Sequence, residues 1–136
     1  MSEGLLDTNV FIHAHTCDAH SASCRALLAG LEVGRVRARI EPLILHELSY
    51  ALPHYLKQMG RAEVAEYLLM ILGWEGVRAE IDLLVDTVER WRDTGGLSFA
   101  DAYLAALAVC QRVPVFTVNV RELRRQGATV PSSLPS

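Results

Sequence analysis

The strongest constraint on the fold is the alternation of short apolar, β-like runs with longer segments of helical periodicity. Gly4-Leu5-Leu6 is the first of the short runs, and Val115 to Val118 is the clearest. Alternation at this spacing is typical of a parallel sheet with helices on both faces. We therefore expect an α/β domain, and we expect its ligands to bind beyond the carboxyl ends of the strands.

The sequence contains no internal repeat and no linker, so residues 1–130 are expected to form a single domain, followed by a frayed tail over 131–136. Pro42 at a first helical position and Gly73 after an apolar helix mark element boundaries. We predict strands at 4–6, 36–40, 76–79, 115–118 and 128–130, and helices at 20–31, 41–52, 61–72, 81–93, 98–112 and 120–125.

Composition excludes several classes of protein. With 51% hydrophobic and 21% charged residues the chain is not intrinsically disordered, and its longest apolar run, Ala102 to Cys110, is too short to span a membrane. Glu3 stands where a secretory signal would be basic, and the three cysteines form no CxxC pair, so we expect a cytoplasmic protein with free thiols. The net charge of −3 argues against nucleic-acid binding by phosphate neutralisation alone, and a bound cation would have to supply positive charge.

Two polar residues follow predicted strands directly. Asp7 comes after Leu5-Leu6, and Asn119 comes after the run that ends at Val118. Both have an alternative explanation as helix caps, since Asp7-Thr8-Asn9 is rich in capping residues and Asn119 stands three residues before Glu122, as in a capping box. The functional interpretation is that both side chains point into the crevice at the strand ends.

Two acids lie within predicted helices. Asp101 stands three residues after Ser98, as in a capping box, yet a mostly apolar segment follows it. Glu47 lies in mid-helix with Leu43, Ile44 and Tyr50 on its stripe, and a carboxylate buried there needs a cation, an arginine or a proton.

Taken together, these residues predict a cation site. Three carboxylates brought close together repel one another, and a hard divalent cation such as Mg²⁺ or Mn²⁺ relieves that repulsion through oxygen ligands. The chemistry that such a site supports is hydrolysis of a phosphodiester, in which the metal polarises the phosphate and activates a water molecule.

Four segments at the right order and separation resemble the PIN-domain nucleases, and in particular the VapC-like toxins of type II toxin–antitoxin pairs. They are Leu5-Leu-Asp-Thr-Asn-Val10, Pro42-Leu-Ile-Leu-His-Glu-Leu48, Phe99-Ala-Asp-Ala-Tyr-Leu-Ala-Ala-Leu-Ala108 and Val115-Phe-Thr-Val-Asn-Val-Arg-Glu-Leu123. The resemblance implies a three-layer α/β/α sandwich around a parallel sheet of about five strands. It also implies endoribonuclease activity that depends on Mg²⁺ or Mn²⁺.

By position, the resemblance makes Asp7 and Asp101 the main metal ligands and Glu47 the third acid, with Thr8 and Thr117 as polar supports. Asn119 takes a fourth catalytic position that is often Asp in the family. Because Asn removes one negative charge, we expect one firmly held ion, with a second recruited only with substrate.

The resemblance further implies an RNA substrate, a homodimer and a cognate antitoxin that covers the site. The apolar run Tyr67 to Leu72 contributes either to a dimer or antitoxin groove or to the core. Arg121, Arg124 and Arg125 either contact RNA phosphates or form a solvated helix face.

Other interpretations remain open. The alternatives to a toxin are a PIN nuclease of RNA processing and a PIN-like module that binds without cutting, although all three carboxylates are present. The motifs of haloacid dehalogenase phosphatases and of receiver domains are incomplete. The histidines and cysteines at 13–24 are close enough in sequence to suggest zinc, but match no standard spacing.

Overall fold

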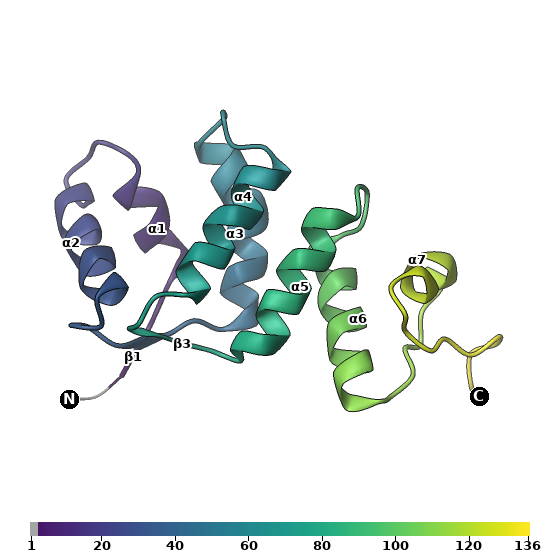
Figure 1. Ribbon diagram of the computed structural model, residues 1–136. Helices are drawn as coiled ribbons and strands as arrows, with labels where there is room; N and C mark the ends of the chain where they lie inside the picture. Colours follow the sequence, from purple (N-terminus) through teal and green to yellow (C-terminus); the bar gives the residue numbers. More distant parts are fainter. Residues whose placement is uncertain (1–2) are drawn as a thin grey trace. The chain divides into compact units, whose positions relative to one another are not determined.

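The computed structural model describes residues 3–136, and the first two residues of the predicted domain lie outside this range. Within it the chain forms the helices and strands labelled in Figure 1 and divides into two compact units. The first unit ends at Ile81 and the second runs from Asp82 to Ser136.

The first unit contains a small parallel sheet. Its strands are β1 (Gly4–Leu5), β2 (Ala38–Arg39) and β3 (Val77–Arg78), and they pair in that order. The register places Leu5 opposite Arg39 and Arg39 opposite Arg78. Parallel strands bring their carboxyl ends to the same edge of a sheet, and Asp7 follows β1 at that edge. The predicted strands at 4–6, 36–40 and 76–79 are therefore confirmed, each as a shorter element.

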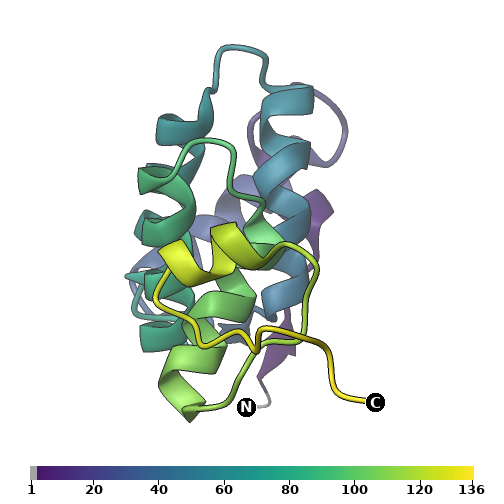
Figure 2. The same ribbon diagram turned by 90° about the vertical axis from the view of Figure 1, so that its right-hand side faces the viewer.

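Four helices complete this unit: α1 (Thr8–Ala14), α2 (Ser21–Glu32), α3 (Pro42–Tyr55) and α4 (Arg61–Leu72). α3 and α4 form a helical hairpin whose connection stands at the top of both views (Figures 1 and 2). Their inward residues include several fully buried core side chains, namely Leu45, Leu48, Leu52, Val64, Leu68 and Ile71. Apolar residues at helical spacing explain both helices from the sequence.

Two details of these helices differ from the prediction. α1 was not predicted, because Asp7, Thr8 and Asn9 have low helix propensity and favour turns; the burial of Phe11 and Ile12 stabilises this short helix instead. α3 was predicted to end at Leu52 but continues through Pro53. Pro53 has no N–H to donate, but the next turn still closes, since Leu56 N donates to Leu52 O at 2.7 Å.

The apolar run Tyr67 to Leu72 belongs mainly to the core. Leu68, Ile71 and Leu72 are buried, and Met70 is its exposed apolar residue. Of the two explanations left open by the sequence, burial in the core accounts for most of this surface, so little of the run remains for a groove that binds a partner.

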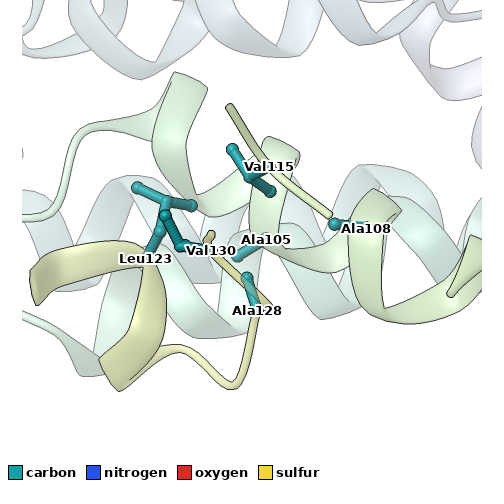
Figure 3. Close-up of a cluster of buried hydrophobic side chains, with 6 residues drawn as sticks. All are labelled: Ala105, Ala108, Val115, Leu123, Ala128 and Val130. Atoms are coloured by element: carbon teal, nitrogen blue, oxygen red, sulfur yellow. The ribbon is translucent and has the colours of Figure 1, made fainter. Parts of the chain in front are cut away.

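The second unit contains most of α5 (Ile81–Asp93), together with α6 (Phe99–Gln111) and α7 (Val120–Arg125). α6 and α7 pack through a cluster of buried apolar side chains to which the segments around Val115 and Val130 also contribute (Figure 3). Leu123 of α7 is fully buried in this cluster, and small residues of α6 allow the close approach.

Two predicted strands of this unit are wrong. Residues 115–118 and 128–130 belong to no helix or strand. They share a backbone bond from Val115 N to Thr129 O at 2.9 Å, but Val118 is 91% exposed, and one such bond does not make a ladder. Over residues 3–136 the sheet therefore has three strands, and the expected count of about five is not confirmed.

Beyond α7 the chain has no helix or strand, and residues 131–136 run as an irregular tail, at the yellow end of the chain in Figure 2. Across the part of the chain that the structure describes, no helix is long and apolar enough to cross a membrane.

Candidate functional site

Asp7 lies between the end of β1 and the start of α1. It is the N-cap of α1, and its Oδ1 accepts a hydrogen bond from Thr8 N at 2.9 Å. Asp7 therefore does cap α1, yet this role does not exclude its use as a metal ligand. Asp7 is exposed, and a carboxylate offers about four acceptor sites, so one capping bond leaves room for a cation.

Thr8 and Glu47 are joined across the first unit. Thr8 Oγ1 donates to Glu47 Oε2 at 3.0 Å, linking the first residue of α1 to the middle of α3. The Thr8 side chain is buried and Glu47 is half-buried. Because Asp7 is adjacent to Thr8 in the chain, this hydrogen bond fixes Glu47 close to the end of β1.

Asp101 and Asn119 form a second pair within the second unit. Asn119 Nδ2 donates to Asp101 Oδ2 at 2.7 Å, and Asn119 N donates to Thr117 Oγ1 at 2.9 Å. Asn119 precedes α7 but makes no side-chain capping bond, so the predicted capping box with Glu122 is wrong. Its amide is used to hold Asp101 instead.

The predicted capping box at the start of α6 is present in its first half. Ser98 Oγ accepts a hydrogen bond from Asp101 N at 3.0 Å and caps the helix. The Asp101 carboxylate lies in the first helical turn and accepts the Asn119 amide. Ser98, rather than Asp101, therefore performs the capping, and the acid is free of that role.

The three carboxylates have neutral hydrogen-bond partners. Among residues 3–136, no Lys, Arg or His side chain forms an ion pair with Asp7, Glu47 or Asp101. Their partners are a backbone N–H, a hydroxyl and an amide. Each acid is therefore oriented but not neutralised, and oxygen donors of this kind suit a hard divalent cation.

The histidines and cysteines at 13–24 do not form a zinc site. His13 Nδ1 pairs with Asp18 Oδ2 at 2.8 Å, His15 Nε2 with Tyr67 Oη at 2.7 Å, and Cys17 is an exposed free thiol. No three His, Cys, Asp or Glu side chains gather to hold a metal within the described range 3–136. These histidine side chains make structural hydrogen bonds.

Burial shifts the acidity of both His15 and Tyr67. Burial, together with the nearby charge of Arg25, lowers the pKa of His15, and burial raises the pKa of Tyr67 to about 12. Both shifts favour the neutral forms at neutral pH.

The arginines of α7 differ from one another. Arg124 Nη2 donates to Val130 O at 2.8 Å and holds the C-terminal segment, while Arg125 makes a long ion pair with Glu122, Nη1 to Oε1 at 3.6 Å. All three arginines are exposed. The sequence predicted all three as RNA contacts or as a solvated face, and the structure gives Arg124 a structural bond.

One feature of the site was missed from the sequence. A hollow of about 250 Å³ lies between α1 and α3 in the first unit, next to the bond between Thr8 and Glu47. Its remaining walls include Asn9, Tyr50 and Tyr55. The sequence does indicate this hollow, because Tyr50 and Tyr55 lie three and eight residues after Glu47 in the same helix.

Comparison with known proteins adds a family match. A protein-family model described as PIN domain matches residues 4–127. The match includes Asp7, Glu47, Asp101 and Asn119, and it extends across both units. No curated protein and no solved structure matches the chain.

Proposed function

Because the chain belongs to the PIN-domain family, we propose that it is an endoribonuclease dependent on Mg²⁺ or Mn²⁺ and that it acts as the toxin of a type II toxin–antitoxin pair. PIN domains are α/β nuclease folds that typically use a divalent metal, so a nuclease fold follows from membership alone. The choice of RNA as substrate, the metals and the toxin role are our proposals.

The observation that carries the proposal is that two of the acids are held by neutral hydrogen-bond donors. Glu47 is held by the Thr8 hydroxyl, and Asp101 is held by the Asn119 amide. A neutral donor fixes a carboxylate in place without cancelling its charge, whereas an arginine would do both. Such oriented and uncompensated acids fit a divalent cation. We propose Asp7, Glu47 and Asp101 as its ligands from their residue types and their places in the matched family segment, while the described residues 3–136 contain no group of three such side chains gathered to hold a metal. When bound, the ion supplies positive charge to the phosphate and a more acidic water molecule.

In this scheme the neighbouring polar residues position the acids. Thr8 restricts Glu47, and Asn119 restricts Asp101, while Thr117 fixes the backbone of Asn119. Asn119 thus donates a hydrogen bond where many family members carry a fourth acid. We therefore propose one firmly bound ion, since the fourth position adds no negative charge.

The reaction that we propose is hydrolysis. An oxygen atom of water bonds to phosphorus, the bond from phosphorus to the 3′ oxygen breaks, and the products carry 5′-phosphate and 3′-hydroxyl ends. Arg121, Arg124 and Arg125, all exposed on α7, are our candidates for contacts to RNA phosphates.

We also propose that residues 1–130 form one PIN domain, since the family match extends across both units. The toxin role places the protein in the cytoplasm as a homodimer with a cognate antitoxin. The surplus of acids supports a basic antitoxin segment, because an Arg or Lys side chain can compensate the same carboxylates that attract the cation.

The test is cleavage of single-stranded RNA by the purified full chain with Mn²⁺ and with EDTA. We expect cleavage with Mn²⁺ only, and Asp7→Asn or Asp101→Asn to lower the rate by about two orders of magnitude or more, as when one electrostatic group is removed from a catalytic site. Asp82→Asn is the matched control, because Asp82 lies in the first turn of α5 as Asp101 does in α6. Cleavage by either site variant in EDTA would refute the mechanism. RNA binding by the wild-type chain without any cleavage would support a binding module instead.

A further inference from the structure

The hollow between α1 and α3 lies beside the proposed metal ligand Glu47. We propose that it is a stacking site for one unpaired nucleobase of the RNA, next to the proposed metal ligand Glu47. This inference rests on the proposed function and specifies how the substrate is held. All of the residues that line the hollow belong to the first unit.

The arrangement of α3 puts aromatic rings beside the acid. Tyr50 and His54 follow Glu47 at i+3 and i+7, so the three side chains share one face of the helix. Tyr55, the last residue of α3, also lines the hollow, and Thr8 and Asn9 line it from α1. Any group that enters the hollow therefore contacts aromatic rings within a turn or two of Glu47.

The two tyrosines are unusually open for residues that face a pocket. Tyr50 is 57% exposed and Tyr55 is 59% exposed, so neither ring is used to fill the core. Each ring is nevertheless oriented by an edge-to-face contact, Tyr50 with His46 at 5.6 Å and Tyr55 with His54 at 4.8 Å between centroids. Exposed and oriented aromatic rings are the usual platforms for bases of single-stranded nucleic acids.

The size and polarity of the hollow favour a single base. Its volume of about 250 Å³ is below the ~300–1,000 Å³ of sites that enclose drug-sized ligands. Buried Ile12 and half-buried Ala51 provide apolar surface, while the exposed Asn9 has an amide that can meet the polar edge of a base. A base inside a duplex is covered by its neighbours, so this hollow selects unpaired RNA.

The negative net charge of the protein favours a binding contact that does not depend on charge, such as stacking. With a net charge of −3, the chain gains little from phosphate neutralisation, and the site acids repel phosphates until a cation binds. Stacking on an aromatic ring depends little on the sign of the protein charge. It therefore supplies RNA affinity in a chain whose 16 acidic residues outnumber its 13 Lys and Arg residues.

The binding experiment uses the full chain carrying Asp101→Asn, with Mn²⁺ and a short 5′-fluorescein single-stranded oligoribonucleotide followed by anisotropy. We expect Tyr50→Ala to weaken binding by about ten- to a hundredfold, the usual loss of one stacked base. Tyr50→Phe and Tyr50→Trp are expected to keep most of the affinity. Leu43→Ala is the control, since Leu43 is 64% exposed on the same helix and does not line the hollow.

A second measurement identifies the base as the partner of the ring. We replace one nucleotide at a time by an abasic residue in otherwise identical RNA. One position is expected to lose about as much affinity as Tyr50→Ala does, and to lose little more when the two changes are combined. Equal effects of abasic sites on wild-type and Tyr50→Ala proteins, or unchanged binding in both Tyr50→Ala and Tyr55→Ala, would overturn the proposal and indicate a protein contact at this surface.

Cleavage is scored separately, with the same RNAs and the chain that retains Asp101, on denaturing gels. If the wild-type chain does not cut but Tyr50 still matters for an unpaired base, the stacking site stands and the proposed nuclease function fails. If the wild-type chain cuts and neither Tyr50→Ala nor Tyr55→Ala alters binding or kcat/KM, the nuclease function stands and the stacking site fails. Absence of both RNA binding and cleavage overturns both.

Discussion

Removing the Thr8 hydroxyl tests the contact that joins the start of α1 to the middle of α3 in the first unit. Thr8→Val keeps the shape of the side chain but leaves Glu47 Oε2 without its donor at 3.0 Å. A hydrogen bond to a charged group contributes ~1.5–3 kcal/mol to stability. Because Glu47 is only half-buried and water replaces part of the bond, we expect a loss of about 1–2 kcal/mol.

The assay is urea unfolding followed by tryptophan fluorescence. Trp91→Phe is used as the background, because Trp74 is then the sole tryptophan and it belongs to the first unit. With a slope of ~2 kcal/mol per molar urea, the midpoint is expected to fall by roughly 0.5–1 M. Ser49→Ala is the matched control in the same unit; its half-buried hydroxyl donates to the neutral His46 O at 2.6 Å, so we expect a smaller loss.

A double-mutant cycle with Glu47→Ala isolates the contact. If the hydrogen bond carries the effect, Thr8→Val is expected to cost less than ~0.5 kcal/mol once Glu47 is already Ala. Additive losses, or a Thr8→Val protein with the wild-type midpoint, would show that Thr8 does not hold Glu47. The same variant is expected to cut RNA more slowly, since Glu47 loses its fixed orientation.

Three further predictions concern stability. Gly76→Ala is expected to cost ~3 kcal/mol or more in urea unfolding, because the added Cβ would lie 2.0 Å from Val36 O, whereas Gly95→Ala, with nothing within 4 Å, is expected to be nearly neutral. Leu123→Ala is expected to lower the free energy of unfolding by ~2–5 kcal/mol, as the side chain is fully buried, and exposed Leu134→Ala gives the baseline. The lowered pKa of His15 means that the unfolded chain binds the proton more readily, so stability is complete above the usual pKa of ~6.5 and falls as the pH drops below it. His15→Gln is expected to flatten the pH dependence of Tm between about pH 7 and 5, and an unchanged slope would contradict this assignment.

The helices were the most predictable part of the fold. α4, α5 and α7 have the predicted bounds, because apolar residues at helical spacing and clear terminal residues specify each of them locally. α1 was missed, since Thr8 and Asn9 favour a turn and only the burial of Phe11 and Ile12 overrides that preference. The segment at 115–118 shows the opposite error, because β-branched and aromatic residues predict a strand, but the ladder must come from a partner.

For the candidate site, the sequence supplied the residues but not their partners. It singled out Asp7, Glu47, Asp101 and Asn119 by residue type and position. It could not distinguish a cap from a ligand, because both uses need the same residue types at helix starts. The structure separates these uses for Asn119, whose amide bonds to Asp101 instead of capping α7.

By itself, then, the sequence determined the order and type of most elements and the identity of the acids, because periodicity and helix-terminal residues act over a few neighbouring positions. Only the tertiary structure decided that Thr8 donates to Glu47, 39 residues away, and that Tyr50 faces a hollow instead of the core. Such facts depend on how separate helices pack, and packing is set by contacts between residues that are distant in sequence.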